Sequence, residues 1–176
     1  MNKSVPMAAA GFAVLAVVAS GLAGVSSANA DAKGSAPRQP AQRAQVSACS
    51  GGSAISMSSR AMDFQSVTAG STTEVEGSQS SVKGPKKGTD TILVTFTAMA
   101  SSGGAGELTT ASLYRDGVGT SEGTKYFTYN NVLDQATVQF CTKIGKGQHT
   151  LALRVTDGGG GATSLYYPTI TYQRFS

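Results

Sequence analysis

Apolar and polar residues alternate over several short stretches of the chain, and no helical periodicity lasts for three turns. The clearest alternation lies in residues 91–99. Its apolar positions are Ile92, Val94, Phe96 and Ala98, and its outward positions include Thr95 and Thr97. This period of two predicts a strand with one buried face and one solvated face.

The same pattern predicts further strands at 134–143, 149–156 and 164–175. Their expected inward residues are Ala136, Val138, Phe140, Leu151, Leu153 and Val155, and their expected outward residues are Thr137, Gln139, Cys141, Thr150, Ala152 and Arg154. Weaker alternation predicts strands at 54–58, 61–67, 72–77, 107–115 and 124–129.

Glycine-rich turns separate these stretches. We expect a hairpin turn at Asp116-Gly117, a turn at Gly145-Lys146-Gly147 and an exposed, flexible loop at the four glycines Gly158 to Gly161. Eight or nine short strands at this spacing are typical of an all-β fold. We predict a single antiparallel β-sandwich, with a jelly roll favoured, over residues 48–176.

The N-terminal segment has the pattern of a secretory signal peptide. Lys3 precedes an apolar run from Met7 to Val25, and Ala28-Asn29-Ala30 supplies the small residues of a cleavage site. We therefore expect residues 1–30 to be removed after Ala30 and the protein to be secreted. An uncleaved membrane anchor is the alternative, because the run approaches spanning length. After residue 30 no apolar run is long enough to span a bilayer, so no membrane insertion is expected once the signal peptide is removed.

Residues 31–47 have few apolar side chains and read as a disordered arm. Losing Lys3 with the signal peptide lowers the formal net charge from +4 to +3, so the charge does not favour nucleic acid as a partner. Cys49 and Cys141 are the two cysteines of the chain, and in an exported protein they are expected to form a disulfide.

Two catalytic motifs occur in unsuitable surroundings. Residues 119–123 match the Gly-x-Ser-x-Gly nucleophile elbow, and Ser80 and Lys83 match Ser-x-x-Lys. The first motif needs a strand-to-helix turn and the second needs a helical turn, whereas both segments read as glycine-flanked loops. His149 is the single histidine, so zinc and nucleophilic catalysis are disfavoured.

Glu74 and Glu76 lie two residues apart on a predicted strand and would share a face. Such a pair could bind Ca²⁺ or act in a glycosidase, possibilities that also include Glu107 and Glu122, although a solvated strand face is commoner. Asp90, Asp116 and Asp157 lie at turns and could also bind Ca²⁺, but turn chemistry already explains the last two. No other cofactor is expected.

Two surface features remain. Lys83, Lys86 and Lys87 form a small basic loop, and three charges alone give little affinity for an anionic polymer at physiological salt. Tyrosines gather in the C-terminal half of the chain, where they could stack on sugar rings or anchor a protein interface. They are Tyr126, Tyr129, Tyr166, Tyr167 and Tyr172, of which the first four are the candidate ligand-binding residues.

The segment from Gly145 through Val155 to Tyr172 contains a Gly-Gln-His-Thr strand entry, a glycine-rich loop and a final strand. It resembles the last two strands of secreted bacterial β-sandwich binding domains and of the C1q and tumour-necrosis-factor-like heads. The resemblance implies a jelly roll and a homotrimer.

Together these observations favour a secreted, non-catalytic β-sandwich that serves as a binding, adhesive or assembly module at or outside the bacterial cell surface. The leading specific alternative is a carbohydrate- or cell-wall-binding module that uses the tyrosines on a polysaccharide. A protein partner is also open, and a small secreted hydrolase with a carboxylate pair is the least favoured alternative.

Overall fold

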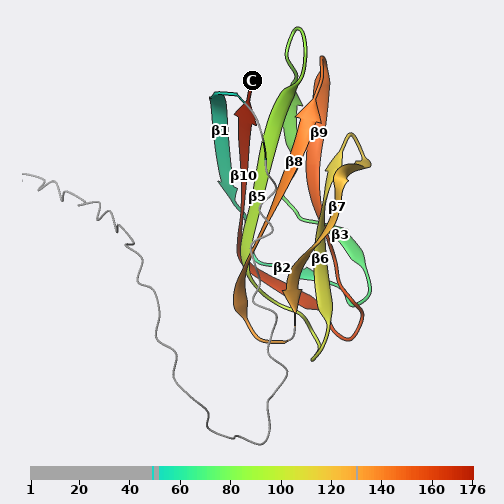
Figure 1. The fold of residues 1–176 in the computed structure, drawn as a ribbon. Coiled ribbons are helices and arrows are strands. Elements are labelled where there is room, and N and C mark those ends of the chain that lie inside the picture. Colours follow the sequence, from blue (N-terminus) through green and yellow to red (C-terminus); the bar gives the residue numbers. More distant parts are fainter. Residues whose placement is uncertain (1–48, 50–51, 130) are drawn as a thin grey trace, which may run out of the picture. The chain divides into compact units, whose positions relative to one another are not determined.

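The computed structural model describes Cys49 and residues 52–129 and 131–176. The predicted signal peptide and the predicted arm lie outside these residues. The described residues form strands joined by turns, and none of their segments is a helix that could cross a membrane (Figure 1). The strands are β1 (Ala54–Ala61), β2 (Gln65–Val67), β3 (Thr72–Glu74), β4 (Ser80–Lys83), β5 (Asp90–Ser101), β6 (Leu108–Arg115), β7 (Val118–Tyr129), β8 (Asp134–Ile144), β9 (Gln148–Thr156) and β10 (Thr163–Phe175).

The strands form two antiparallel sheets that pack face to face. Sheet A has the order β1-β10-β5-β8, with β2 also paired to β10, and sheet B has the order β3-β9-β6-β7, with β4 also paired to β9. Each sheet therefore has four strand positions, because β1 and β2 share one edge and β3 and β4 share another. This order confirms the predicted all-β sandwich and is that of a jelly roll.

The alternation that predicted the long strands is confirmed by their burial. The side chains of Ile92, Val94, Phe96 and Ala98 on β5 are at most 1% exposed, and the inward residues of β8 and β9 are equally buried. Ala152 is an exception: it was expected to face solvent but is 7% exposed. It lies on the outer face of β9, where it pairs with Tyr114 of β6.

Aromatic side chains join the two sheets across the core. The ring centroids of Phe96 on β5 and Phe127 on β7 are 4.9 Å apart, and Phe140 on β8 is fully buried beside them in the same cluster. Burial of each such ring stabilises the fold by about 2–3 kcal/mol. These residues fix the distance between the sheets and therefore the position of every outward side chain.

Three local predictions are wrong. Residues Ser80–Lys83 form the short strand β4 rather than a loop, because their backbone pairs with Gln148–Leu151 of β9. The motif at 119–123 lies inside β7 rather than in a hairpin loop. Strand β3 ends at Glu74, so Glu76 lies in the following turn and not on a strand.

The predicted hairpin turn at Asp116-Gly117 is confirmed. It joins β6 to β7, and its two central residues have φ angles of 54° and 79°. A type I′ turn requires positive φ at both positions, which glycine adopts freely and aspartate tolerates.

The loop from Gly158 to Gly161 is exposed, as predicted, but it packs closely on the β5–β6 loop. A Cβ atom on Gly161 would lie 2.7 Å from the carbonyl oxygen of Gly103, and one on Gly158 would lie 2.7 Å from that of Leu108. The absence of side chains therefore lets two backbones approach, so close packing rather than freedom of movement explains these glycines.

Candidate functional site

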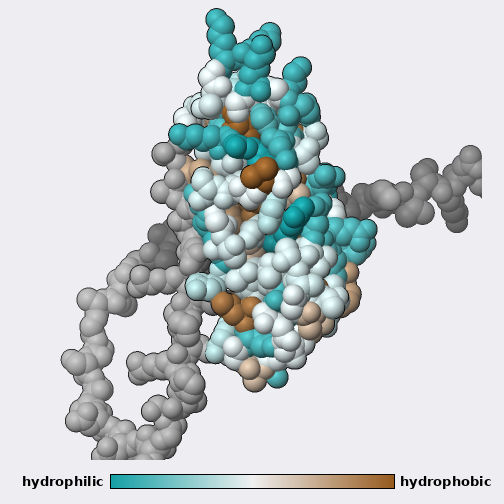
Figure 2. All heavy atoms as spheres, turned by 90° about the vertical axis from the view of Figure 1, so that its right-hand side faces the viewer, coloured by the Kyte–Doolittle hydropathy of each residue, from teal (hydrophilic) through white to brown (hydrophobic). Residues whose placement is uncertain are grey.

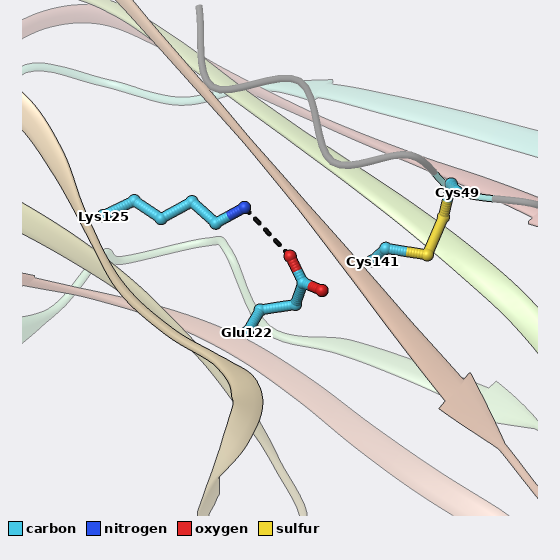
Figure 3. Close-up of a disulfide and its surroundings, with 4 residues drawn as sticks. All are labelled: Cys49, Glu122, Lys125 and Cys141. Atoms are coloured by element: carbon cyan, nitrogen blue, oxygen red, sulfur yellow. Dashed lines mark hydrogen bonds and ion pairs between the residues drawn. A yellow bond between two sulfur atoms is a disulfide. The ribbon is translucent and has the colours of Figure 1, made fainter.

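The predicted disulfide is present. Cys49 and Cys141 are bonded, with their Cα atoms 5.4 Å apart (Figure 3). Cys141 lies on the outward phase of β8, the edge strand of sheet A, and is half-buried. The bond therefore attaches the chain before β1 to the opposite edge of the same sheet.

A polar cavity of about 510 Å³ lies beside the disulfide, between the edge strands β7 and β8. Its lining includes Arg115, Lys143, Glu122 and the hydroxyl-bearing Thr120 and Thr142. Glu122 does not project freely into it, because its Oε2 atom accepts a 2.9 Å hydrogen bond from Nζ of Lys125, as Figure 3 shows.

Lys125 itself is 9% exposed and faces the space between the sheets. Its Nζ lies 5.3 Å from the centroid of the Phe140 ring, so a carboxylate and an aromatic face both stabilise the ammonium group. This arrangement makes Glu122 the partner of a nearly buried cation, which is a structural role.

The four candidate tyrosines lie on two different sheets. Tyr126 and Tyr129 belong to β7 of sheet B, and Tyr166 and Tyr167 belong to β10 of sheet A. The side chains of Tyr126 and Tyr129 are 65% and 42% exposed, whereas Phe127 between them is 2% exposed. The sequence predicted the residues without showing that they form two separate groups.

A β-bulge places Tyr126 and Tyr129 on the same face. Tyr126 pairs with Thr110 and Thr128 pairs with Thr109, so Phe127 is an extra residue in β7. In a regular strand, residues three apart point to opposite faces, but the bulge reverses the phase. Both tyrosines therefore point outward from sheet B while Phe127 fills the core.

Two rows of polar side chains cross sheet B beside these tyrosines. The first row is Thr72, Thr156, Thr110 and Tyr126, and the second is Glu74, Arg154, Ser112 and Thr124. The hydroxyls of Thr72 and Thr156 are 2.8 Å apart, and those of Ser112 and Thr124 are 2.9 Å apart. These hydrogen bonds restrain the positions of the hydroxyl groups on the outer face of sheet B.

Arg154 connects the second row to a third aromatic side chain. Its Nε lies 3.9 Å from Oε2 of Glu74, and its guanidinium carbon lies 4.2 Å from the centroid of the Tyr114 ring. We call the surface formed by Tyr126, Tyr129, Leu108 and the two rows the tyrosine face. It combines exposed aromatic rings with hydrogen-bond donors and acceptors.

The other tyrosines lie elsewhere. Tyr166 contacts Phe64, with ring centroids 4.9 Å apart, and pairs in register with Met99 on β5. Tyr167 is 80% exposed in the irregularity of β10, with a φ of 50°. Tyr172 is buried, and its hydroxyl donates a hydrogen bond to the carbonyl oxygen of Ser78.

Phe64 is a surface aromatic that the sequence did not identify, although it is 55% exposed. It lies in the short connection between β1 and β2, inside the stretch 61–67 predicted as one strand. In a continuous strand Phe64 is one alternating position among several, so the pattern did not single it out.

The two glutamates of the proposed carboxylate pair, Glu74 and Glu76, have different neighbours. Glu74 faces Arg154, whereas the backbone of Glu76 is held in its turn by both atoms of the Gln65 amide, at 2.8 and 2.9 Å. Among the residues that the structure describes, no three histidine, cysteine or acidic side chains form a metal-binding group.

The turn aspartates and the histidine join backbone segments. Asp116 accepts hydrogen bonds from the Thr150 N–H and pairs with Nδ1 of His149 at 2.7 Å, contacts that lower the pKa of its carboxyl group. The second ring nitrogen of His149 lies 3.3 Å from the Gly145 carbonyl oxygen, so the ring links two turns. Asp90 pairs with Arg174, with Oδ2 2.6 Å from Nε.

Asp157 organises the loop between β9 and β10. It is 3% exposed and accepts hydrogen bonds from the N–H groups of Gly70 and Gly159 and from the hydroxyl of Thr163. Burial raises the pKa of this carboxyl group, but these hydrogen bonds outweigh the effect, and the net result is a lowered pKa. All three turn aspartates thus have structural partners.

No protein-family model matches the chain. No curated protein sequence matches it either.

Solved structures with a similar arrangement include the C-terminal domain of EclA, a sugar-binding protein, at 18% identity over 66% of this chain and 79% of that one, with a TM-score of 0.35. A family 35 carbohydrate-binding module from Clostridium thermocellum is 12% identical over 64% of this chain and 97% of that one, also with a TM-score of 0.35. A carbohydrate-binding module of a Cellvibrio mixtus lichenase, solved with cellotriose, is 14% identical over 68% of this chain and 89% of that one, with a TM-score of 0.35. Similarity at this level is one of general architecture.

Proposed function

We propose that this protein is a non-catalytic binding module that holds a polysaccharide or cell-wall polymer on its tyrosine face. The observation that carries the proposal is the pair of exposed rings, Tyr126 and Tyr129, brought to one face of sheet B by the bulge at Phe127. A secreted protein with a disulfide would meet such polymers outside the cytoplasm.

Aromatic rings suit this ligand because one face of a pyranose ring carries several C–H groups. These groups can cover the apolar, electron-rich face of a tyrosine ring, while the sugar hydroxyls reach polar neighbours. On the tyrosine face the neighbours are hydroxyl groups such as Thr110 and the Arg154–Glu74 pair, which supply both donors and acceptors. The two rows cross the whole sheet, so the face offers contacts over a length that suits an extended chain better than a small molecule.

The positions of the acidic side chains support the non-catalytic part of the proposal. Glu74 faces an arginine and Glu122 faces a nearly buried lysine. Glu107 lies in the β5–β6 loop against the backbone of Gly104 and Gly160. A glycosidase needs two carboxyl groups that face each other across one bond, and these residues belong to three different regions.

Co-sedimentation with insoluble peptidoglycan, chitin and cellulose tests the proposal. The wild-type protein should bind one of these polymers saturably, and Tyr126→Ala should weaken that binding. A sugar that covers about 60 Å² of the ring gains about 1.5 kcal/mol, which corresponds to about a tenfold change in the dissociation constant. The far-UV circular dichroism should not change, because Tyr126 contributes no core packing.

Tyr167→Ala is the matched control, since it removes an exposed ring from sheet A. It should bind like the wild type. Loss of binding in Tyr167→Ala, with normal binding in Tyr126→Ala, would move the site to the other sheet and refute the assignment. Absence of saturable binding to all three polymers would refute the polysaccharide proposal itself. Polymer cleavage that Glu74→Gln abolishes would contradict the non-catalytic role.

A further inference from the structure

Six cationic side chains gather at one end of the sandwich, although they lie far apart in the sequence. They are Lys83, Lys86, Lys87, Arg115, Lys143 and Lys146, and all six are exposed. We call this set the basic end. In Figure 2, hydrophilic side chains project from the upper end of the molecule, where Figure 1 shows the β4–β5 and β8–β9 loops.

Strand pairing brings these residues together. Lys83 at the end of β4 pairs with Gln148 at the start of β9, and Lys143 near the end of β8 pairs with Thr91 near the start of β5. Arg115 ends β6 at the hairpin turn. The sequence showed a basic loop of three lysines, and the fold adds three more cations to it.

Direct contacts hold in place the loops that carry these cationic side chains. The Gly84 N–H donates a 2.6 Å hydrogen bond to the Gly147 carbonyl oxygen, and a Cβ atom on Gly84 would lie 1.7 Å from the carbonyl oxygen of Gly145. The Arg115 guanidinium donates a hydrogen bond to the backbone carbonyl oxygen of Lys143. The basic end is therefore a fixed arrangement of charges and not a set of independent loops.

The acidic groups nearby have their direct ion pairs with other residues. Asp90 pairs with Arg174, and Asp116 pairs with His149 while also attracting the adjacent Arg115. Within the described part of the chain, no ion pair involves any of the six cations. Asp134, in contrast, lies at the start of β8, at the other end of the strand that carries Lys143.

The polar cavity between β7 and β8 adjoins the basic end. Arg115 and Lys143 belong to both, and the remaining lining includes the hydroxyl-bearing residues Thr91, Thr120 and Ser121. The lining also includes one carboxylate, Glu122, whose charge is balanced by its ion pair with Lys125. The cavity volume of about 510 Å³ lies in the usual range for small-ligand sites. Cations and hydroxyl groups together suit a ligand that carries both negative charge and hydroxyls.

The composition of the loops distinguishes among polyanions. Residues 84–89, 116–117 and 145–147 contain no aromatic residue and no large aliphatic residue, although Val118, which follows the hairpin turn and lines the cavity, is an exposed aliphatic side chain. Single-stranded nucleic acid is held largely by stacking on aromatic rings, and a membrane surface is held by inserted apolar side chains. A hydrated polymer needs neither of these.

We propose that the basic end binds an anionic polysaccharide, one that carries carboxylate, sulfate or phosphate groups, with one acidic unit in the cavity between β7 and β8. This site is separate from the tyrosine face and does not depend on the function proposed for it. The six cations would contact the charged groups along the polymer, and the hydroxyl-bearing residues of the cavity would contact its sugar hydroxyls.

The number of contacts determines how strongly the binding affinity depends on the salt concentration. If each contact releases about 0.7 of a counterion, as for a single-stranded polyanion, six contacts lower the affinity about 300-fold between 50 and 200 mM salt. Three contacts would lower it about 20-fold over the same range. The slope of the binding constant against salt therefore counts the contacts.

Binding is measured with polygalacturonate and dextran sulfate, and with neutral dextran for comparison, using protein produced from the complete coding sequence. The test variant is Lys86→Gln/Lys87→Gln/Lys146→Gln, and Lys→Arg at the same three positions preserves the charge. The wild type should bind one of the acidic polymers but not dextran. The Gln variant should lose about half of the salt slope, and the Arg variant should keep it.

A charge-matched control carries Ala105→Glu, Asn131→Asp and Gln135→Glu, which change the net charge equally in regions remote from the basic end. It should retain wild-type binding, and so should Tyr126→Ala. Equal weakening by the control and by the Gln variant would show a general charge effect and overturn the proposal. So would absence of binding to both acidic polymers, or tighter binding to anionic lipid vesicles or to single-stranded DNA.

Discussion

Removing the disulfide should weaken the fold more than any exposed substitution. Cys49 and Cys141 are separated by 92 residues, a segment that includes strands β1 to β7 and most of β8. In the chain-entropy model, a crosslink that closes a loop of this length stabilises the folded state by about 4–5 kcal/mol at 25 °C, because it restricts the unfolded chain. We therefore expect Cys49→Ala/Cys141→Ala to lose most of that free energy of unfolding.

Packing contributes little to this value. Both cysteines are half-buried and lie outside the hydrophobic core, so truncation leaves no large cavity. A typical domain is stable by about 5–15 kcal/mol, so the variant should still fold but with a much lower urea midpoint. The m-value should rise, because the unfolded chain without the crosslink exposes more surface.

Urea denaturation followed by far-UV circular dichroism measures both quantities, and it needs no tryptophan. Wild-type protein treated with a reductant should reproduce the curve of the double variant, whereas the variant should not respond to the reductant. A loss below about 1 kcal/mol with an unchanged m-value would refute the reasoning, since it would mean that the crosslink does not restrict the unfolded state.

Three further predictions concern single residues. Tyr172→Phe should lower the free energy of unfolding, measured by urea denaturation, by about 1–2 kcal/mol, because the buried carbonyl of Ser78 loses its hydrogen-bond donor. Burial also raises the pKa of Tyr172, so this phenol should stay protonated in an alkaline titration of the native wild type. Asp157 has a lowered pKa, so its stabilising effect is present at neutral pH and is lost as the pH falls through the native-state value. Asp157→Asn should be less stable at pH 7, and its melting temperature should fall less between pH 5 and pH 3; parallel curves for the two proteins would contradict this. Gly84→Ala should destabilise the folded state by about 2 kcal/mol or more, because the new methyl group would overlap the Gly145 carbonyl oxygen and force the two backbone segments apart. An unchanged melting temperature would show that these two loops can separate without loss of stability.

The long strands could be predicted because their alternation reflects burial directly. Residues 91–99 fill one side of the core at every second position, and tertiary structure changes only the strand ends there. The short strand β4 could not be predicted in the same way. It has a single apolar residue, Val82, and exists because β9 offers it backbone hydrogen bonds.

The candidate sites depend even more on distant parts of the chain. The tyrosines could be identified from the sequence, but their phase depends on the bulge at Phe127, which no local signal indicates. The basic end depends on which strand ends are neighbours. Lys86 and Lys146 come together because β4 pairs with β9, an arrangement set by the whole sandwich.

The bulge at Phe127 also has an evolutionary consequence. Deletion of Phe127 would leave Tyr126 opposite Thr110, Thr128 opposite Thr109 and Tyr129 opposite Leu108, so the strand would alternate regularly and both tyrosines would still point outward. The deletion would remove an aromatic ring from the core but not from the surface. Substitution at Tyr126 or Tyr129, rather than loss of the bulge residue, is therefore the change by which related chains would diverge in what they bind.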